Sequence, residues 1–478
     1  MAKIIAALLC AGLIWWLFRL DRNPKVRVSK AVWIPLLWLL IAASRNISDW
    51  LQMSGGGAGD YTEGSPLDRA VLSVILAFGV VVLARRGTRV WALVRSNLPI
   101  LLYFVYCGIS VLWSDFPDVA FKRWFRACGD IVMVLVLLSE PDWLAAVKRL
   151  LSRLGFLLVP VSILFIRYYP QLGRVYTRSG RPTWVGVATD KNALGMLCLI
   201  CGLASIYRFL EIWKGKEGEG SRKKNWLIAQ GLLIAMTMYL IKEADSATAF
   251  ACCGMAGGVM VLTYLYRWAR RPVILNSMVA AVIGIAFGAL FLGIGSGMVE
   301  DLGRDSSLTG RTAIWTSVLK QVHNPIVGTG FESFWIGPRR FKVMADIDQG
   351  VNQAHNGYLE IYLNLGWVGI AILATLIVAG YRRIIPAVRR QTQAGSLRLA
   401  YFIVAIAYNF TEGGFKMMHP VWIVFLLSTA IPPRVPAPSR SKTRAQLDEA
   451  RLLAKSADAD SSEEERKASI VAVNLATR

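Results

Sequence analysis

The sequence contains few charged residues for its length. Only 18% of its 478 residues are Asp, Glu, Lys or Arg, against about 25% in a typical soluble domain. Hydrophobic residues make up 55% of the chain, and the mean hydropathy is +0.46. One soluble core cannot bury this much apolar surface, and a disordered chain needs a much more polar composition. The composition therefore excludes both classes and indicates a polytopic helical membrane protein.

Histidine and cysteine are also scarce, and this excludes further classes. Nearly all of the seven Cys lie in apolar runs, including the CxxC formed by Cys198 and Cys201, which favours buried thiols over a disulfide scaffold. The three His are scattered, so we expect no metal and no cofactor. HExxH, GxSxG and Walker A motifs are absent, and no predicted cytoplasmic segment is large enough for a nucleotide-binding domain.

Apolar runs of membrane-spanning length recur along the chain. A transmembrane helix needs about 20 mostly apolar residues. Thirteen candidate spans are 4–18, 31–47, 67–84, 98–113, 127–139, 150–166, 192–210, 225–241, 247–266, 273–294, 357–381, 399–411 and 418–432. Several are short, and twelve is the nearest alternative. The sequence thus predicts an all-α polytopic integral membrane protein with about 12–13 transmembrane helices.

The distribution of Lys and Arg predicts the orientation of these spans. The loops that separate the spans fall into two alternating sets, and one set is more than twice as dense in Lys and Arg as the other. Because positive charge accumulates on the cytoplasmic side, the denser set is predicted to face inward. The net charge of +23 then reflects topology and contact with membrane lipids, not nucleic acid.

The predicted spans and loops divide the chain into four parts. Residues 1–294 form an N-terminal transmembrane bundle of about ten spans, which includes an outer basic loop, 167–191. Residues 295–357 form one long extracytoplasmic loop, and 357–432 form the C-terminal transmembrane helices. Residues 433–478 begin with PPRVPAPSRSK and continue with mixed charge, so they are predicted to be a disordered cytoplasmic tail.

His355 is the first candidate for chemistry. It lies on the predicted outer side, directly before the span 357–381, and Asn356 and Gly357 permit a tight entry into that helix. The positive end of the helix dipole disfavours imidazolium and keeps a neutral base, and it also suits a bound anion. An interfacial His that only caps the helix is an equally good interpretation. His323 and His419 are interpreted as structural.

The long outer loop contains a second candidate, Arg311. The segment TGRTAIWTSVLKQVHNP predicts a short amphipathic helix whose apolar stripe includes Trp315 and lies on the bilayer or against the bundle. Arg311 lies one turn before Trp315, where a guanidinium can bind phosphate oxygens or snorkel to the membrane surface. After this helix, Gly328, Gly330 and Gly337 predict turns and close backbone approaches.

The outer loop 167–191 combines positive charge with aromatic residues. Arg174, Arg178, Arg181 and Lys191 are interleaved with Tyr and Trp, a composition that suits either a phosphorylated lipid-linked glycan or lipid headgroups. Glu412 ends its span on the same predicted side, and an acid at such a depth usually has a partner.

The order of the motifs resembles a known family. GR-x3-W (Gly310, Arg311, Trp315), NP-x2-G-x-G from Asn324, FESFW, and AHNGYLE-x5-G-x2-G are similar to the O-antigen ligase and Wzy-type polymerase family. FESFW and DKNALG look most like the branch that polymerises exopolysaccharides of the succinoglycan type. The similarity covers roughly residues 98–432, with its specific motifs in 181–195 and 306–370.

The resemblance implies an activity. It implies a GT-C-like glycosyltransferase of the bacterial inner membrane that acts at the periplasmic face, inverts the anomeric carbon and needs no metal. The implied donor is an undecaprenyl-diphosphate-linked oligosaccharide. The acceptor is a growing glycan for a polymerase or lipid A core for an O-antigen ligase. A chain-length regulator and a flippase are candidate partners, and a lipid-linked glycan transporter is the non-enzymatic alternative.

The resemblance also assigns roles to residues. His355 matches the family's catalytic base, and Arg311 matches an Arg that binds the donor diphosphate. A second such Arg is expected from loop 167–191, with Arg178 or Arg181 as the best fit and Arg174 as a further candidate. Supporting roles fall to the residues Glu412, Asn356, Lys191 and Trp315.

Overall fold

The computed structural model describes most of the chain. It covers residues 1–23, 28–51, 64–176, 180, 182–215, 220–291, 308–348 and 350–432. The described residues belong to one compact unit, Met1–Pro432. The tail predicted at 433–478, and two of the arginines predicted to bind diphosphate, Arg178 and Arg181, lie outside the described residues.

The described residues are almost entirely helical, which confirms the predicted fold class. The elements up to the outer basic loop are α1 (Ala2–Leu20), η1 (Lys30–Val32), α2 (Trp33–Ala42), α3 (Ile47–Trp50), α5 (Pro66–Arg85), α6 (Gly87–Ser96), α7 (Leu98–Ile109), η2 (Ser110–Trp113), α8 (Pro117–Leu138), α9 (Trp143–Tyr168) and α10 (Pro170–Gly173). The later elements are β1 (Arg174–Tyr176), β2 (Pro182–Trp184), α11 (Lys191–Trp213), α12 (Gly220–Ala244), α13 (Ala247–Leu265), η3 (Trp268–Arg270), α14 (Pro272–Phe291), α16 (Leu308–Lys320), α17 (Pro338–Ile347), α18 (Gly357–Arg390), α19 (Gly395–Thr411) and α20 (Pro420–Thr429).

Each of the thirteen predicted spans overlaps a helix. Among the described residues, seven helices are long and apolar enough to cross a membrane: α1, α5, α9, α11, α12, α13 and α18. The pair formed by α6 and α7–η2 is bent by 85° and adds an eighth if it is counted as one span. The total of 12–13 spans therefore stays a prediction.

The structure adds two local elements inside predicted loops and moves the start of one predicted span. The predicted inner loop 85–97 contains helix α6, which begins and ends next to spans. Helix α8 begins at Pro117, well before the predicted span, because Pro at the first turn starts a helix and charged residues are tolerated at its outer end. The outer basic loop contains a short antiparallel hairpin, in which Arg174 pairs with Trp184 and Tyr176 with Pro182.

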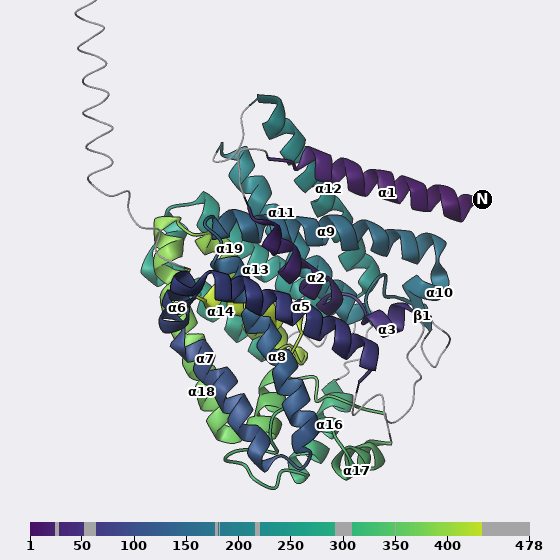
Figure 1. Ribbon diagram of the computed structural model, residues 1–478, viewed down its shortest axis with the longest axis vertical. Helices are drawn as coiled ribbons and strands as arrows, with labels where there is room; N and C mark the ends of the chain where they lie inside the picture. Colours follow the sequence, from purple (N-terminus) through teal and green to yellow (C-terminus); the bar gives the residue numbers. More distant parts are fainter. Residues whose placement is uncertain are drawn as a thin grey trace, which may run out of the picture. The chain divides into compact units, whose positions relative to one another are not determined.

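The main core is built around three helices that the other helices surround. Every residue of α19 from Gly395 to Asn409 is buried, as is every residue of α20, and most of α11 is buried with them. Helix α19 packs against α11, α13, α14, α18 and α20. By contrast, only Ala6 and Leu17 of α1 are buried, and α1 lies along the edge of the unit (Figure 1). A helix that is apolar all round is buried by protein or by lipid, and both cases occur here.

A second, smaller core holds the long outer loop together. Ile314 and Val318 of α16 pack with Phe334, Val343 of α17 and Leu363 of α18. Helices α16 and α17 lie side by side at the lower edge of the view in Figure 1. The sequence left open whether the apolar stripe of α16 meets the bilayer or protein, and its central residues meet protein.

Helix α18 is broken near its start, which the sequence did not predict. Gly366 has φ of 64°, a left-handed conformation that favours glycine. The amide of Trp367 donates to the carbonyl of Pro325 (2.9 Å), and that of Val368 donates to the carbonyl of Ile326 (3.1 Å). The chain around Asn324 therefore replaces the helical partners that the break removes.

The glycines of the loop make close backbone approaches, as predicted, and make them at this break. Gly328 and Gly330 have φ of 70° and 91°, and the amide of Gly330 donates to the carbonyl of Asn364 (2.9 Å). A Cβ on Gly328 would lie 2.5 Å from the backbone of Asn364. The NP-x2-G-x-G and G-x2-G motifs thus form one interlocked backbone structure, which fixes the short first segment of α18.

Replacing Gly366 by Ala tests this interlock. A Cβ at this position would lie 2.2 Å from the carbonyl oxygen of Ile326, and a left-handed L-residue costs about 1–2 kcal/mol by itself. We expect Gly366→Ala to lower the melting temperature of the purified protein by several degrees. Gly258→Ala is the control, because nothing lies within 4 Å of a Cβ there. Equal melting temperatures for both variants would contradict the interlock.

The predicted orientation can be tested with single cysteines. Ala345 of α17 and Thr392, between α18 and α19, are both exposed. In a background without the seven native Cys, a membrane-impermeant maleimide should label Ala345→Cys on intact cells and label Thr392→Cys only after permeabilisation. The opposite pattern would reverse the topology.

Candidate functional site

His355 lies in a constrained stretch of backbone directly before α18. Its φ is 50°, a strained value for a residue with a side chain, and such strain is often found at functional sites. Trp315 donates its indole N–H to the carbonyl of Ala354 (2.8 Å), and the amide of Ala354 donates to the carboxylate of Glu360. Asn356 caps α18 by accepting from the amides of its first turn. Both neighbours of His355 are therefore fixed, which positions its ring.

The ring of His355 contacts a buried carboxylate, that of Glu412. His355 Nδ1 lies 3.2 Å from Oε2 of Glu412, whose side chain is only 8% exposed. Oε1 of the same carboxylate lies 3.3 Å from Nη2 of Arg311 and accepts from Nδ2 of Asn192 (3.0 Å). The structure thus brings His355, Arg311 and Glu412 together, although they are far apart in the sequence.

The two ring nitrogens of His355 have different surroundings. With its proton on Nδ1, the ring donates to Glu412 and Nε2 keeps its lone pair. The His355 side chain is 33% exposed and lines a cavity of about 570 Å³. A carboxylate that orients a histidine in this way is the arrangement that general bases use in many enzymes. The cluster can therefore remove a proton from a hydroxyl group in the cavity.

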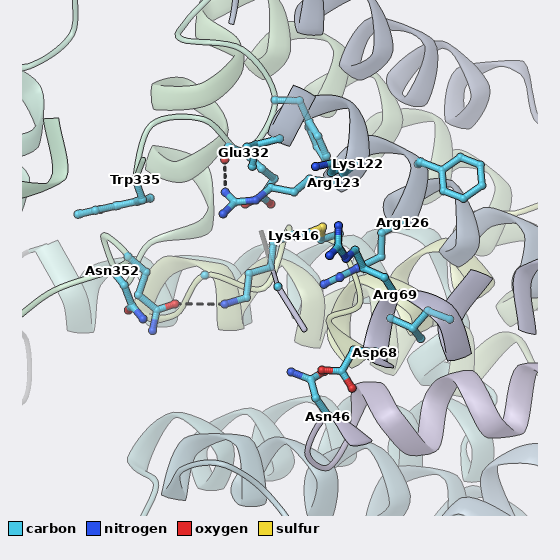
Figure 2. Close-up of a pocket in the computed structure, with 18 of the residues that line it drawn as sticks. Asn46, Asp68, Arg69, Lys122, Arg123, Arg126, Glu332, Trp335, Asn352 and Lys416 are labelled. Atoms are coloured by element: carbon cyan, nitrogen blue, oxygen red, sulfur yellow. Dashed lines mark hydrogen bonds between the residues drawn. The ribbon is translucent and has the colours of Figure 1, made fainter. Parts of the chain in front are cut away.

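A larger cavity, of about 930 Å³, adjoins this one. Its cationic lining residues are Arg69, Lys122, Arg123, Arg126 and Lys416. Figure 2 shows these side chains converging from α5, from α8 and from the loop after α19. The loop is held in place by buried Asp130, which accepts from the indole of Trp38 (2.8 Å) and from the amide of Met418 (2.9 Å).

The sequence reasoning missed these cations as candidate site residues. Three of them, Lys122, Arg123 and Arg126, lie in 114–127, the connection between the predicted spans 98–113 and 127–139. That segment is as dense in Lys and Arg as loop 167–191, which attracted attention for its charge. The density of positive charge on the predicted outer side was therefore the signal that could have identified them.

The described candidates from loop 167–191 lie outside the His355–Glu412–Arg311 cluster. Arg174 donates twice to the carbonyl of Ile166 (3.0 and 2.9 Å), and its guanidinium lies 4.6 Å from the ring centroid of Trp184. Lys191 lines the smaller cavity, and its Nζ lies 3.8 Å from the exposed carboxylate of Asp245. Arg174 therefore holds the loop against α9, and Lys191 lies at the cavity edge.

The remaining histidines differ in position. His323 is exposed at the end of α16, whereas His419 lines the same smaller cavity as His355. The ring of His419 lies 5.9 Å from that of Tyr408. Among the residues that the structure describes, no group of three or more His, Cys, Asp or Glu side chains could hold a metal ion.

Comparison with known proteins supports the family suggested by the motifs. Residues 230–374 match the family model described as O-antigen ligase. The predicted resemblance is confirmed. The matched region includes Arg311, Trp315, His355 and Asn356, so four of the candidate site residues lie within it.

A curated relative points in the same direction. The chain is 24% identical over 303 residues to the exopolysaccharide production protein ExoQ of Rhizobium meliloti (strain 1021). The alignment covers 60% of this chain and 65% of the relative, so the chain spans less than two thirds of that protein's length.

The carboxylate of Glu412 can be tested by its contribution to stability. Glu412→Ala leaves Arg311 and Asn192 without their shared acceptor, and breaking a buried ion pair costs about 3–5 kcal/mol. We expect a clear drop in the melting temperature of the purified protein. Glu243→Ala breaks the pair with half-exposed Arg167 (3.5 Å), where about 0–1 kcal/mol is expected. A melting temperature for Glu412→Ala equal to that of the control would show that the contacts of the Glu412 carboxylate do not stabilise the protein.

Proposed function

We propose that this protein is a glycosyltransferase of the bacterial inner membrane, with its active site at the periplasmic face. It transfers an oligosaccharide from undecaprenyl diphosphate to a glycan acceptor and polymerises repeat units in exopolysaccharide biosynthesis. The observation that carries the proposal is the contact of His355 with Glu412 and Arg311, within and beside the region that matches the O-antigen ligase model. The similarity to an exopolysaccharide production protein favours the polymerase.

The proposed reaction uses His355 as the general base. Its Nε2 takes the proton from an acceptor hydroxyl as that oxygen forms a bond to the anomeric carbon of the donor. The bond from this carbon to the lipid diphosphate breaks, and the diphosphate leaves with the electron pair. Attack from the face opposite to the leaving group inverts the anomeric centre. A diphosphate is already a good leaving group, so the reaction needs no metal.

Arg311 is proposed to neutralise the departing donor diphosphate. One of its nitrogens contacts Glu412, and a guanidinium has five N–H donors in total. Its side chain is 24% exposed, so donors remain available to an oxyanion. Electrostatic stabilisation of developing charge is often the largest single contribution to catalysis.

An O-antigen ligase is the second candidate function, because the matched family model carries that description. It would use the same donor and the same base, and would differ only in transferring the glycan to lipid A core. A lipid-linked glycan transporter is the third. It would need no base, so loss of His355 would leave transport intact.

The decisive experiment replaces His355. Purified His355→Ala, with undecaprenyl-diphosphate-linked repeat units and EDTA in the assay, should lose roughly 10²–10⁴-fold in transfer rate, the usual contribution of a general base. Membrane abundance and melting temperature should stay near those of the wild type. EDTA alone should leave the wild-type rate unchanged.

The matched control is His323→Ala, since His323 is exposed and lies outside the candidate site. It should retain wild-type activity. Near wild-type transfer by His355→Ala at equal abundance would show that the base is another residue. Loss of wild-type activity in EDTA, restored by a divalent ion, would contradict the metal-independent reaction.

A further inference from the structure

The two cavities adjoin and share part of their lining. Both are lined by Arg126, Asp190, Gln353 and Lys416. His355 and Glu412 line the smaller cavity, and the cationic residues gather in the larger one. A molecule whose hydroxyl group reaches His355 can therefore extend into the larger cavity. At about 930 Å³, that cavity lies in the upper part of the range for small-molecule sites, roughly 300–1,000 Å³.

The larger cavity gathers positive charge from two helices. Arg69 and Arg123 are close enough to repel Arg126 electrostatically, and Asp68 attracts it. Among the described residues, no hydrogen bond or ion pair involves the side chain of Arg69 or Arg126. Guanidinium groups gathered in this way are suited to phosphate oxygens, which accept from them in pairs.

Five carboxylates line the same cavity, those of Asp49, Asp68, Asp190, Glu332 and Glu360, and three of them accept from the protein's own donors. Asp68 accepts from both the amide and the hydroxyl of Ser48. Asp190 caps α11 by accepting from the amides of its first turn, and Glu360 accepts from Trp335 and Ala354. With Asp68, Asp190 and Glu360 engaged by the protein's own donors, a bound anion can satisfy Arg69 and Arg126.

The cavity also has an apolar edge. Phe121 and Phe125 of α8 line it, and each is about half exposed (52% and 48%). They lie one turn apart on the same helix as Arg126, and their exposed rings face away from the protein interior. A ligand with a charged head and a long apolar tail can place its head on the cations and extend its tail past these rings.

A short chain of contacts connects the cations to the candidate base. Lys416 Nζ lies 3.4 Å from Oε1 of Gln353, and Gln353 Nε2 lies 3.5 Å from Nδ1 of His355. Arg311, by contrast, contacts Glu412 and is not among the described residues that line either cavity. The arginine next to Glu412 and the cationic cavity are therefore separate positions for an anion.

We propose that Arg69, Arg126 and Lys416, with Arg123, form a second anion site that binds the phosphate-bearing head of the acceptor lipid. This inference rests on the proposed function, in which the acceptor hydroxyl must reach His355 while Arg311 serves the donor diphosphate. The substrate that occupies the two adjoining cavities is then the acceptor, and its own phosphate lies on the cations. The protein thus joins two lipid-linked substrates, as a polymerase requires.

The test counts bound lipids on the whole protein. Wild-type protein in detergent is titrated with undecaprenyl diphosphate and analysed by native mass spectrometry. We expect two equivalents for the wild type and one for Arg69→Gln/Arg126→Gln, with affinity for the lost site weakened about tenfold or more, as for the loss of charge-assisted hydrogen bonds. Neither replaced side chain forms a described hydrogen bond, so the double variant should fold. Arg89→Gln/Arg95→Gln on α6, outside both cavities, is the matched control and should bind two.

Further titrations, with other ligands and with His355→Ala, distinguish a site for the lipid phosphate from other kinds of binding. Undecaprenol, which lacks phosphate, should fill neither position, and inorganic diphosphate should bind much more weakly than the lipid. A single equivalent in the wild type, two equivalents in Arg69→Gln/Arg126→Gln, or equal affinity for inorganic diphosphate would overturn the proposal. His355→Ala should still bind two equivalents. Its transfer activity tests the proposed function, whereas its lipid count tests only the second site.

Discussion

Glu412, which directly follows α19, joins its own segment to the three other segments of the candidate site. It accepts from the start of α11 through Asn192 and contacts Arg311 of α16 and the ring of His355. The backbone carbonyl of Glu412 accepts from the amide of Gly357 at the start of α18 (3.1 Å). A carboxylate buried among apolar helices needs such partners, because an unpaired charge there is very costly. The same requirement that stabilises the junction therefore fixes the orientation of the histidine.

The surrounding structure holds Glu412 and its partners next to the two cavities. The outer core around α16 and α17 holds Trp315, which fixes the residue before His355. The buried pair of Trp38 and Asp130 holds the loop that carries Lys416. Side chains from both halves of the chain thus line the two adjoining cavities. The match to the O-antigen ligase model, residues 230–374, leaves out the helices α5 and α8 that supply most of the cations.

Much of this arrangement follows from the sequence, for identifiable reasons. The apolar runs predicted every major helix, and the position of His355 before a span predicted a capped helix start. The proximity of Glu412 to His355 was expected only in outline, since an acid at that depth requires a partner. The role of Arg69 and Arg126 could not be predicted, because they lie on different helices far apart in the sequence and a lone Arg near a span end resembles a topology signal. The break at Gly366 was hidden because apolar residues continue on both sides of it.

The first turns of α18 have a consequence for how the protein can evolve. Tyr358, Ile361 and Leu365 pack into the main core, whereas Leu359, Tyr362 and Leu363 pack into the outer core. A helix enclosed from both sides has no face on which substitutions are neutral. We therefore expect this segment to diverge slowly, unlike lipid-facing α1. New glycan specificities would then arise from changes in the cavity walls, while the segment that follows His355 keeps its sequence.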